Sequence, residues 1–154
     1  MLEKVSATGL NLDKFVFLTP EAQSCKLCDE GFWCELINKF QSEGYDVFVN
    51  LASDNVRLQN TISYKTCSLS LEEAFALAKR AKKIVSLRSG FTEILLQTEA
   101  PMDILYTEFR HRPCFGDMDV QHVMSGFGIA QLPLVEKEKI REIEVQEIVE
   151  YEKG

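Results

Sequence analysis

Residues 84–93 read Ile-Val-Ser-Leu-Arg-Ser-Gly-Phe-Thr-Glu, and this stretch decides the fold class. Its apolar beginning, Ile84 to Leu87, predicts a buried strand. Ser89 and Gly90 then turn the chain directly into a helical stretch that stops before Pro101. A buried strand that leads straight into a helix is typical of a β-α-β unit with parallel strands.

Strand and helix signals alternate along most of the chain. The clearest helix start is at Ser70 and Glu73, whose side chains fit a capping box. Gly44 stands where an earlier amphipathic helix should end. We expect strands over 14–18, 45–50, 64–67, 84–87 and 102–106, and helices over 30–43, 71–81 and 91–98. This pattern predicts an α/β fold, a three-layer Rossmann-like domain with a mainly parallel sheet.

The C-terminal part of the chain is less regular. Glycines and a proline interrupt residues 110–134, and the acidic tail that follows has apolar positions at Ile140, Ile143 or Val145, Ile148 and Tyr151. This spacing favours a terminal helix that packs back onto the domain, with a strand as the alternative. We expect a single domain over 1–154, with its core at about 14–107 and an irregular C-terminal extension over 108–154.

Composition excludes several classes of protein. The chain has 154 residues, of which 45% are hydrophobic, and a net charge of -7. No apolar run approaches the ~20 residues that span a bilayer, and an acidic balance disfavours a general nucleic-acid binder. Five cysteines, an odd number, without a secretion-signal pattern at Met1 to Val5 indicate reduced thiols and a cytoplasmic protein.

Ligands of open parallel sheets bind beyond the carboxyl ends of the strands. Three segments should lie there: Thr19–Cys25, Arg88–Glu93 and Thr107–Arg112. A Ser-Gly pair that opens a helix offers free backbone amides to an anion, and Arg88 adds a permanent cation. Alternatively, Ser89 only caps the helix, Gly90 only makes a turn, and Glu93 only complements the helix dipole.

The third segment carries Arg110 and Arg112 on either side of His111. This concentration of cations would suit a diphosphate, and equally a solvated surface loop. No G-x-G-x-x-G follows the first strand, no phosphate-binding G-x-x-x-x-G-K-[ST] occurs, and no G-x-S-x-G marks a serine nucleophile.

The cysteines allow two further kinds of site. Cys25 and Cys28 form a C-x-x-C pair with the spacing of thiol redox proteins, although their neighbours differ from that motif. A zinc site at Cys25, Cys28 and Cys34 would need a fourth ligand, and neither His111 nor His122 has a suitable spacing. We expect ordinary thiols and no metal.

Several segments together resemble the nucleotide-sugar-binding half of GT-B glycosyltransferases, with heptosyltransferases and polysaccharide-biosynthesis enzymes as the most similar members. The resemblance covers roughly Lys14 to Thr107. It is carried by the segments TPEAQS (19–24), GYDVFVN (44–50), LSLEEA (69–74) and AKKIVSLRSGFTE (81–93).

The resemblance implies a C-terminal donor-binding domain of an enzyme with two facing Rossmann-like domains. Arg88 to Phe91 would form the phosphate-side turn, Glu93 would bind hydroxyl groups, and Glu21 to Ser24 would face the cleft. The acceptor domain, which usually supplies the catalytic base, is missing, so we expect a donor-binding half that a further domain or a partner subunit completes.

The nucleotide-sugar donor would be bound without metal or cofactor, and no catalytic residue is identified. A non-catalytic nucleotide- or ligand-binding regulatory module on the same fold is the alternative, which leaves open whether the chain is an enzyme. The binding residues would be Glu21, Gln23, Ser24, Arg88, Ser89, Gly90, Phe91, Thr92, Glu93, Thr107, Arg110 and Arg112.

Overall fold

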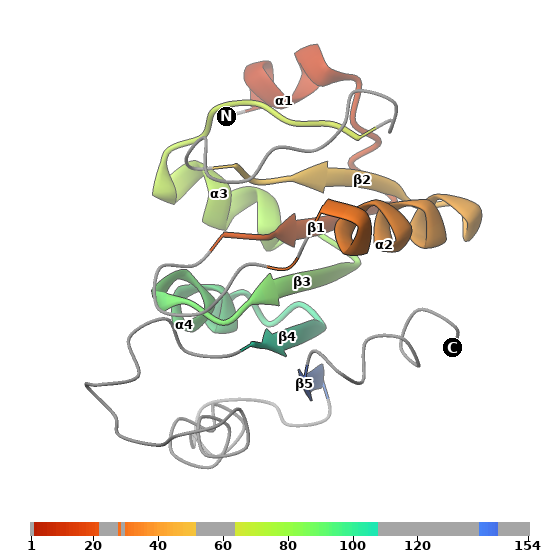
Figure 1. Ribbon diagram of the computed structural model, residues 1–154. Helices are drawn as coiled ribbons and strands as arrows, with labels where there is room; N and C mark the ends of the chain where they lie inside the picture. Colours follow the sequence, from red (N-terminus) through yellow and green to blue (C-terminus); the bar gives the residue numbers. More distant parts are fainter. Residues whose placement is uncertain (1, 22–27, 29, 52–63, 108–138, 145–154) are drawn as a thin grey trace.

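The computed structural model describes residues 2–21, 28, 30–51, 64–107 and 139–144. These residues form one five-stranded, all-parallel sheet in the order β2-β1-β3-β4-β5 (Figure 1). The strands are β1 (Phe15–Thr19), β2 (Asp46–Val49), β3 (Lys83–Leu87), β4 (Met102–Tyr106) and β5 (Ile140–Glu144). The helices are α1 (Leu2–Thr8), α2 (Glu30–Ser42), α3 (Leu71–Ala78), α4 (Gly90–Leu95) and the 3-10 turn η1 (Leu96–Thr98). The α/β, Rossmann-like prediction is confirmed.

Helices cover both faces of the sheet, so its strands are apolar on both sides. On one face α1, α3 and α4 contribute to a core in which the rings of Phe17 and Phe48 stack at 5.7 Å. On the other face α2 places Trp33, Leu36 and Ile37 against the sheet. All three side chains are at most 1% exposed. The helices and the sheet therefore form three layers.

Two predicted helix boundaries are confirmed. After α2, Gly44 adopts a φ of 88°, and the Tyr45 amide donates to the Phe40 carbonyl at 3.0 Å, which completes a Schellman motif. Before α3, the Ser70 Oγ accepts from the Glu73 amide at 3.2 Å, and Glu73 Oε1 accepts from the Ser70 amide at 3.0 Å. Gly44 therefore marks the end of α2, and the capping box marks the start of α3.

The tail departs from the sequence prediction. Residues 140–144 form β5, which extends the sheet beyond β4 with Leu105 and Ile143 as register partners. The helix prediction is wrong here because a spacing of three, which places Ile140 and Ile143 on one side of a helix, places them on opposite faces of a strand. Both faces of this sheet are apolar, and each isoleucine joins a different core. Residues 145–154 lie outside the described part.

Two smaller differences lie near β2. The expected strand at 64–67 is reduced to an isolated bridge between Lys65 and Phe48. The N-terminal helix α1 was not predicted, yet its Val5 is fully buried in the core. Within the described residues, no helix is both long enough and apolar enough to cross a bilayer.

Candidate functional site

The direction of the connections reverses between β1 and β3. The chain leaves β1 toward β2 on one side, whereas it leaves β3 toward β4 on the other (Figure 1). The two strands are directly paired, with Thr19 and Ser86 as register partners near their carboxyl ends. Open α/β sheets bind ligands at such a reversal. The prediction that the segments after these two strands leave the same edge of the sheet is confirmed.

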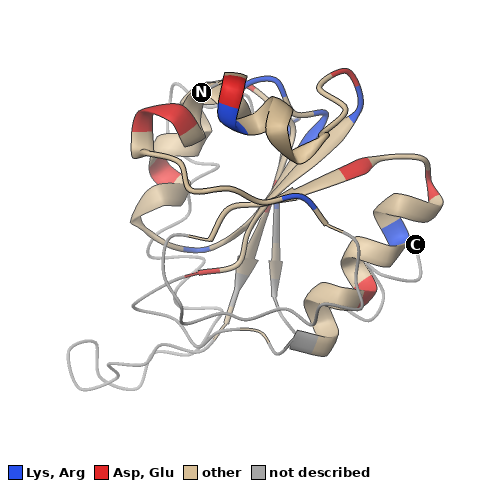
Figure 2. Ribbon diagram, turned by 90° about the horizontal axis from the view of Figure 1, so that it is seen from above, with Lys and Arg blue, Asp and Glu red and all other residues tan. Residues whose placement is uncertain are grey.

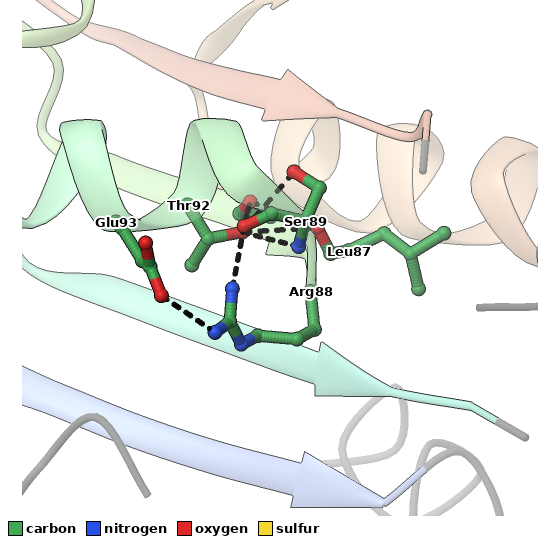
Figure 3. A network of polar contacts seen from close by, with 6 residues as sticks. Leu87, Arg88, Ser89, Thr92 and Glu93 are labelled. Atoms are coloured by element: carbon green, nitrogen blue, oxygen red, sulfur yellow. Dashed lines mark hydrogen bonds and ion pairs between the residues drawn. The ribbon is translucent and has the colours of Figure 1, made fainter. Parts of the chain in front are cut away.

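The turn from β3 into α4 is organised by the hydroxyl of Thr92 (Figure 3). Its Oγ1 accepts from the Ser89 amide at 2.9 Å and donates to the Leu87 carbonyl at 3.1 Å. It also lies 2.8 Å from the Ser86 Oγ. The Ser89 Oγ is 3.4 Å away as well, so this fully buried hydroxyl is the centre of four polar contacts. Thr92 therefore shapes the turn from inside.

Arg88 and Glu93 form an ion pair across the same turn. The Arg88 Nη2 lies 2.9 Å from the Glu93 Oε1, and the Arg88 Nη1 donates to the Ser89 carbonyl at 2.5 Å. Figure 3 shows the arginine side chain turned toward Glu93. The arginine side chain is 13% exposed and the glutamate side chain 61%. The cation expected to face a ligand is thus engaged within the turn, and the carboxylate is the outward member.

Gly90 leaves space beside the backbone. Its φ is not positive, and a Cβ added there would meet no neighbour among the described residues within 4 Å. Neither the turn nor internal packing therefore requires glycine at this position. Ser89 occupies the N-cap position in an extended conformation, and its carbonyl accepts a hydrogen bond from the Thr92 amide at 3.1 Å.

The remaining predicted residues lie around this turn or outside the described part. Glu21 follows β1 and is half-buried, while Thr107 follows β4 and is 6% exposed. Phe91 packs against the core that contains α3. Four predicted residues lie outside the described part of the chain: Gln23, Ser24, Arg110 and Arg112.

No metal centre is formed by the described residues, because no three His, Cys, Asp or Glu side chains among them are grouped to hold an ion. Cys25, His111 and His122 lie outside these residues, so the expectation of ordinary thiols stays a prediction. At Cys67, burial raises the pKa of the thiol more than nearby Lys4 lowers it. A raised pKa disfavours a reactive thiolate there.

Sequence reasoning did not identify a charged cluster across three strands. Asp103, with a side chain only 4% exposed, lies 2.9 Å from Lys83 Nζ on β3 and accepts two hydrogen bonds from Arg141 on β5. The lone acid within the apolar run MDILY (102–106) was the available signal. Asp103 is the second residue of β4, away from the carboxyl edge, so the cluster joins strands. Elsewhere, Figure 2 shows charges of both signs on the helices and loops.

Comparison with known proteins gives structural matches only. No protein-family model matches the chain, and no curated sequence matches it significantly. E. coli ADP-heptose LPS heptosyltransferase II matches with a TM-score of 0.63 and 17% identity, over 96% of this chain and 46% of that one. E. coli heptosyltransferase WaaC, solved with ADP-2-deoxy-2-fluoro heptose, matches with a TM-score of 0.60 and 17% identity, over 88% of this chain and 39% of that one.

This chain spans less than half the length of either enzyme. At such identities the matches concern the arrangement of strands and helices. The chain has a Rossmann-type α/β fold similar to that of part of these two heptosyltransferases.

Proposed function

We propose that this chain is the donor-binding half of a glycosyltransferase of polysaccharide biosynthesis, and that it binds a nucleotide sugar beyond the carboxyl ends of β1 and β3. One observation carries the proposal: Thr19 and Ser86 are paired where the connections of the sheet diverge. A ligand crevice is expected at that reversal. The likeness to WaaC, which was solved with a nucleotide-sugar analogue, supports a donor of that class.

The surroundings of this edge suit a nucleotide sugar. The open space at Gly90 admits close approach of a ligand to the backbone. The exposed carboxylate of Glu93 is an acceptor for hydroxyl groups. Glu21, with Gln23 and Ser24, would face the ligand from the segment after β1. Thr107 follows β4 at the same edge, and Arg110 and Arg112 beyond it would supply positive charge.

The chemistry would be electrostatic. Transfer of the sugar leaves a nucleoside diphosphate with developing negative charge, and preorganised donors and cations stabilise it. No metal is needed for this role. The acceptor and the catalytic base would come from a further domain or a partner subunit, acting in the cytoplasm.

A thermal-shift screen tests the proposal. Ligands that bind only the folded state raise the melting temperature. ADP, CDP, GDP and UDP, each free and linked to a hexose, form the panel, with NAD as the control because the dinucleotide fingerprint is absent. We expect at least one nucleoside diphosphate or nucleotide sugar to raise Tm in a concentration-dependent way, while NAD does not. A panel without any such shift would refute donor binding.

A further inference from the structure

The Arg88–Glu93 ion pair is asymmetric. Arg88 is mostly buried and is held at two points, by the Ser89 carbonyl and by Glu93. Glu93 is mostly exposed, and only its Oε1 contacts Arg88. The pair therefore has an inner member that is fixed and an outer member with a second carboxylate oxygen available to the surroundings.

A second arginine of this chain, Arg141, makes a bidentate interaction with a carboxylate. Arg141 uses its Nε and Nη2 together, at 3.3 and 3.1 Å from the two oxygens of Asp103. Arg88 offers the same edge, but only its Nη2 contacts Glu93, and its buried Nε finds no hydrogen-bond partner among the described residues. A phosphate could not reach that Nε while the guanidinium stays in place.

These contacts assign different roles to the two residues. We propose that Arg88 is a positioning residue, which holds the Glu93 carboxylate in place to accept hydrogen bonds from hydroxyl groups of the nucleotide sugar, and that Arg88 does not itself bind the diphosphate. A carboxylate only accepts hydrogen bonds, so it suits the hydroxyls of the ligand and repels its phosphates. The inference rests on the proposed function and specifies which part of the ligand meets this turn.

A double-mutant cycle tests the inference. The probe is the panel nucleotide sugar that raises Tm most, and its Kd is measured by isothermal titration for wild type, Arg88→Met, Glu93→Gln and the double variant. Loss of a hydrogen bond to a charged group should weaken binding by Glu93→Gln about tenfold to a hundredfold. Arg88→Met should weaken it by a similar factor. The double variant should be no weaker than Glu93→Gln, because Arg88 acts only through Glu93.

Two further variants separate positioning from folding. Arg141→Met makes the same change in another ion pair and should leave Kd unchanged. Arg88→Lys keeps a cation beside Glu93 and should recover part of the affinity lost in Arg88→Met. The inference would be overturned if the Kd of the double variant rose by the product of the two single-variant factors, or if Glu93→Gln bound more tightly than wild type. The proposed function would stand in either case. A panel in which wild type binds nothing would overturn both.

Discussion

Thr19 of β1 and Ser86 of β3 are register partners, although the chain reaches β3 only after passing through β2 and α3. This pairing places the carboxyl end of β1 beside the β3–α4 turn. A buried hydrogen bond between the Ser86 and Thr92 hydroxyls, which lie 2.8 Å apart, holds the turn. A preorganised turn of this kind loses little conformational freedom when a ligand binds.

Gly90→Ala should separate binding from stability. Within the described residues the added methyl group would meet no side chain or packed backbone within 4 Å, and the backbone there is not left-handed. The variant should therefore be more stable by about 0.4–1 kcal/mol, because alanine restricts the unfolded chain. If a ligand approaches this backbone, the methyl group should weaken nucleotide-sugar binding. Urea titration and isothermal titration measure the two effects, and unchanged affinity would place the ligand elsewhere.

Gly44→Ala should have the opposite effect on stability. Gly44 has a φ of 88°, where a side chain costs about 1–2 kcal/mol. A Cβ would also lie 3.1 Å from the Nζ of Lys14. The same substitution in a Lys14→Ala background removes that contact. We expect most of the loss in unfolding free energy to persist there, and its disappearance would assign the cost to the contact.

Ser70→Ala should lower the unfolding free energy by about 1 kcal/mol, because the Glu73 amide at the start of α3 loses its acceptor. Ser68→Ala is the matched control, since Ser68 is exposed and precedes the helix. Its effect should stay within about 0.5 kcal/mol. Equal effects of the two substitutions in urea titration would argue against the capping box.

Stability should depend on pH through Glu73. The hydrogen bond from Lys4, with that from the Ser70 amide, lowers the pKa of Glu73 from 4.5 to about 2. Because the folded-state pKa is the lower one, this stabilisation is complete above pH 4.5 and is lost as pH falls from 4.5 to 2. Urea titrations across this window should show a shallower pH dependence for Glu73→Gln than for wild type. Equal slopes for Glu73→Gln and wild type would contradict the assignment.

The fold was predictable where its signals are local. The Ser70–Glu73 capping box and Gly44 each specify one helix end through neighbouring atoms, and apolar runs mark β1, β3 and β4. At β5 the sequence favoured a helix and left a strand as the alternative, because the pairing of β5 with β4 is non-local. Its pattern of isoleucines fits a helix as well as an edge strand of a sheet with two apolar faces.

The candidate site was predictable in its position and not in its side-chain contacts. The strand ends at Thr19 and Leu87 follow from the order of apolar runs and turns. The orientation of Arg88 depends on which carboxylate and carbonyl surround it after folding, which are those of Glu93 and Ser89. The sequence placed Arg88, Ser89 and Glu93 in one predicted turn, but it did not indicate that Arg88 would contact the other two.

The location of bound ligand is the most direct test of the central claim. Amide chemical shifts of the ¹⁵N-labelled chain can be followed while the most stabilising panel nucleotide sugar is added. Binding at the reversal between β1 and β3 predicts that the largest changes fall at Thr19 to Glu21 and at Leu87 to Glu93. Residues at the opposite edge, such as Lys83 and Met102, should change little. Saturable binding with its largest shifts at that opposite edge would contradict the proposed site.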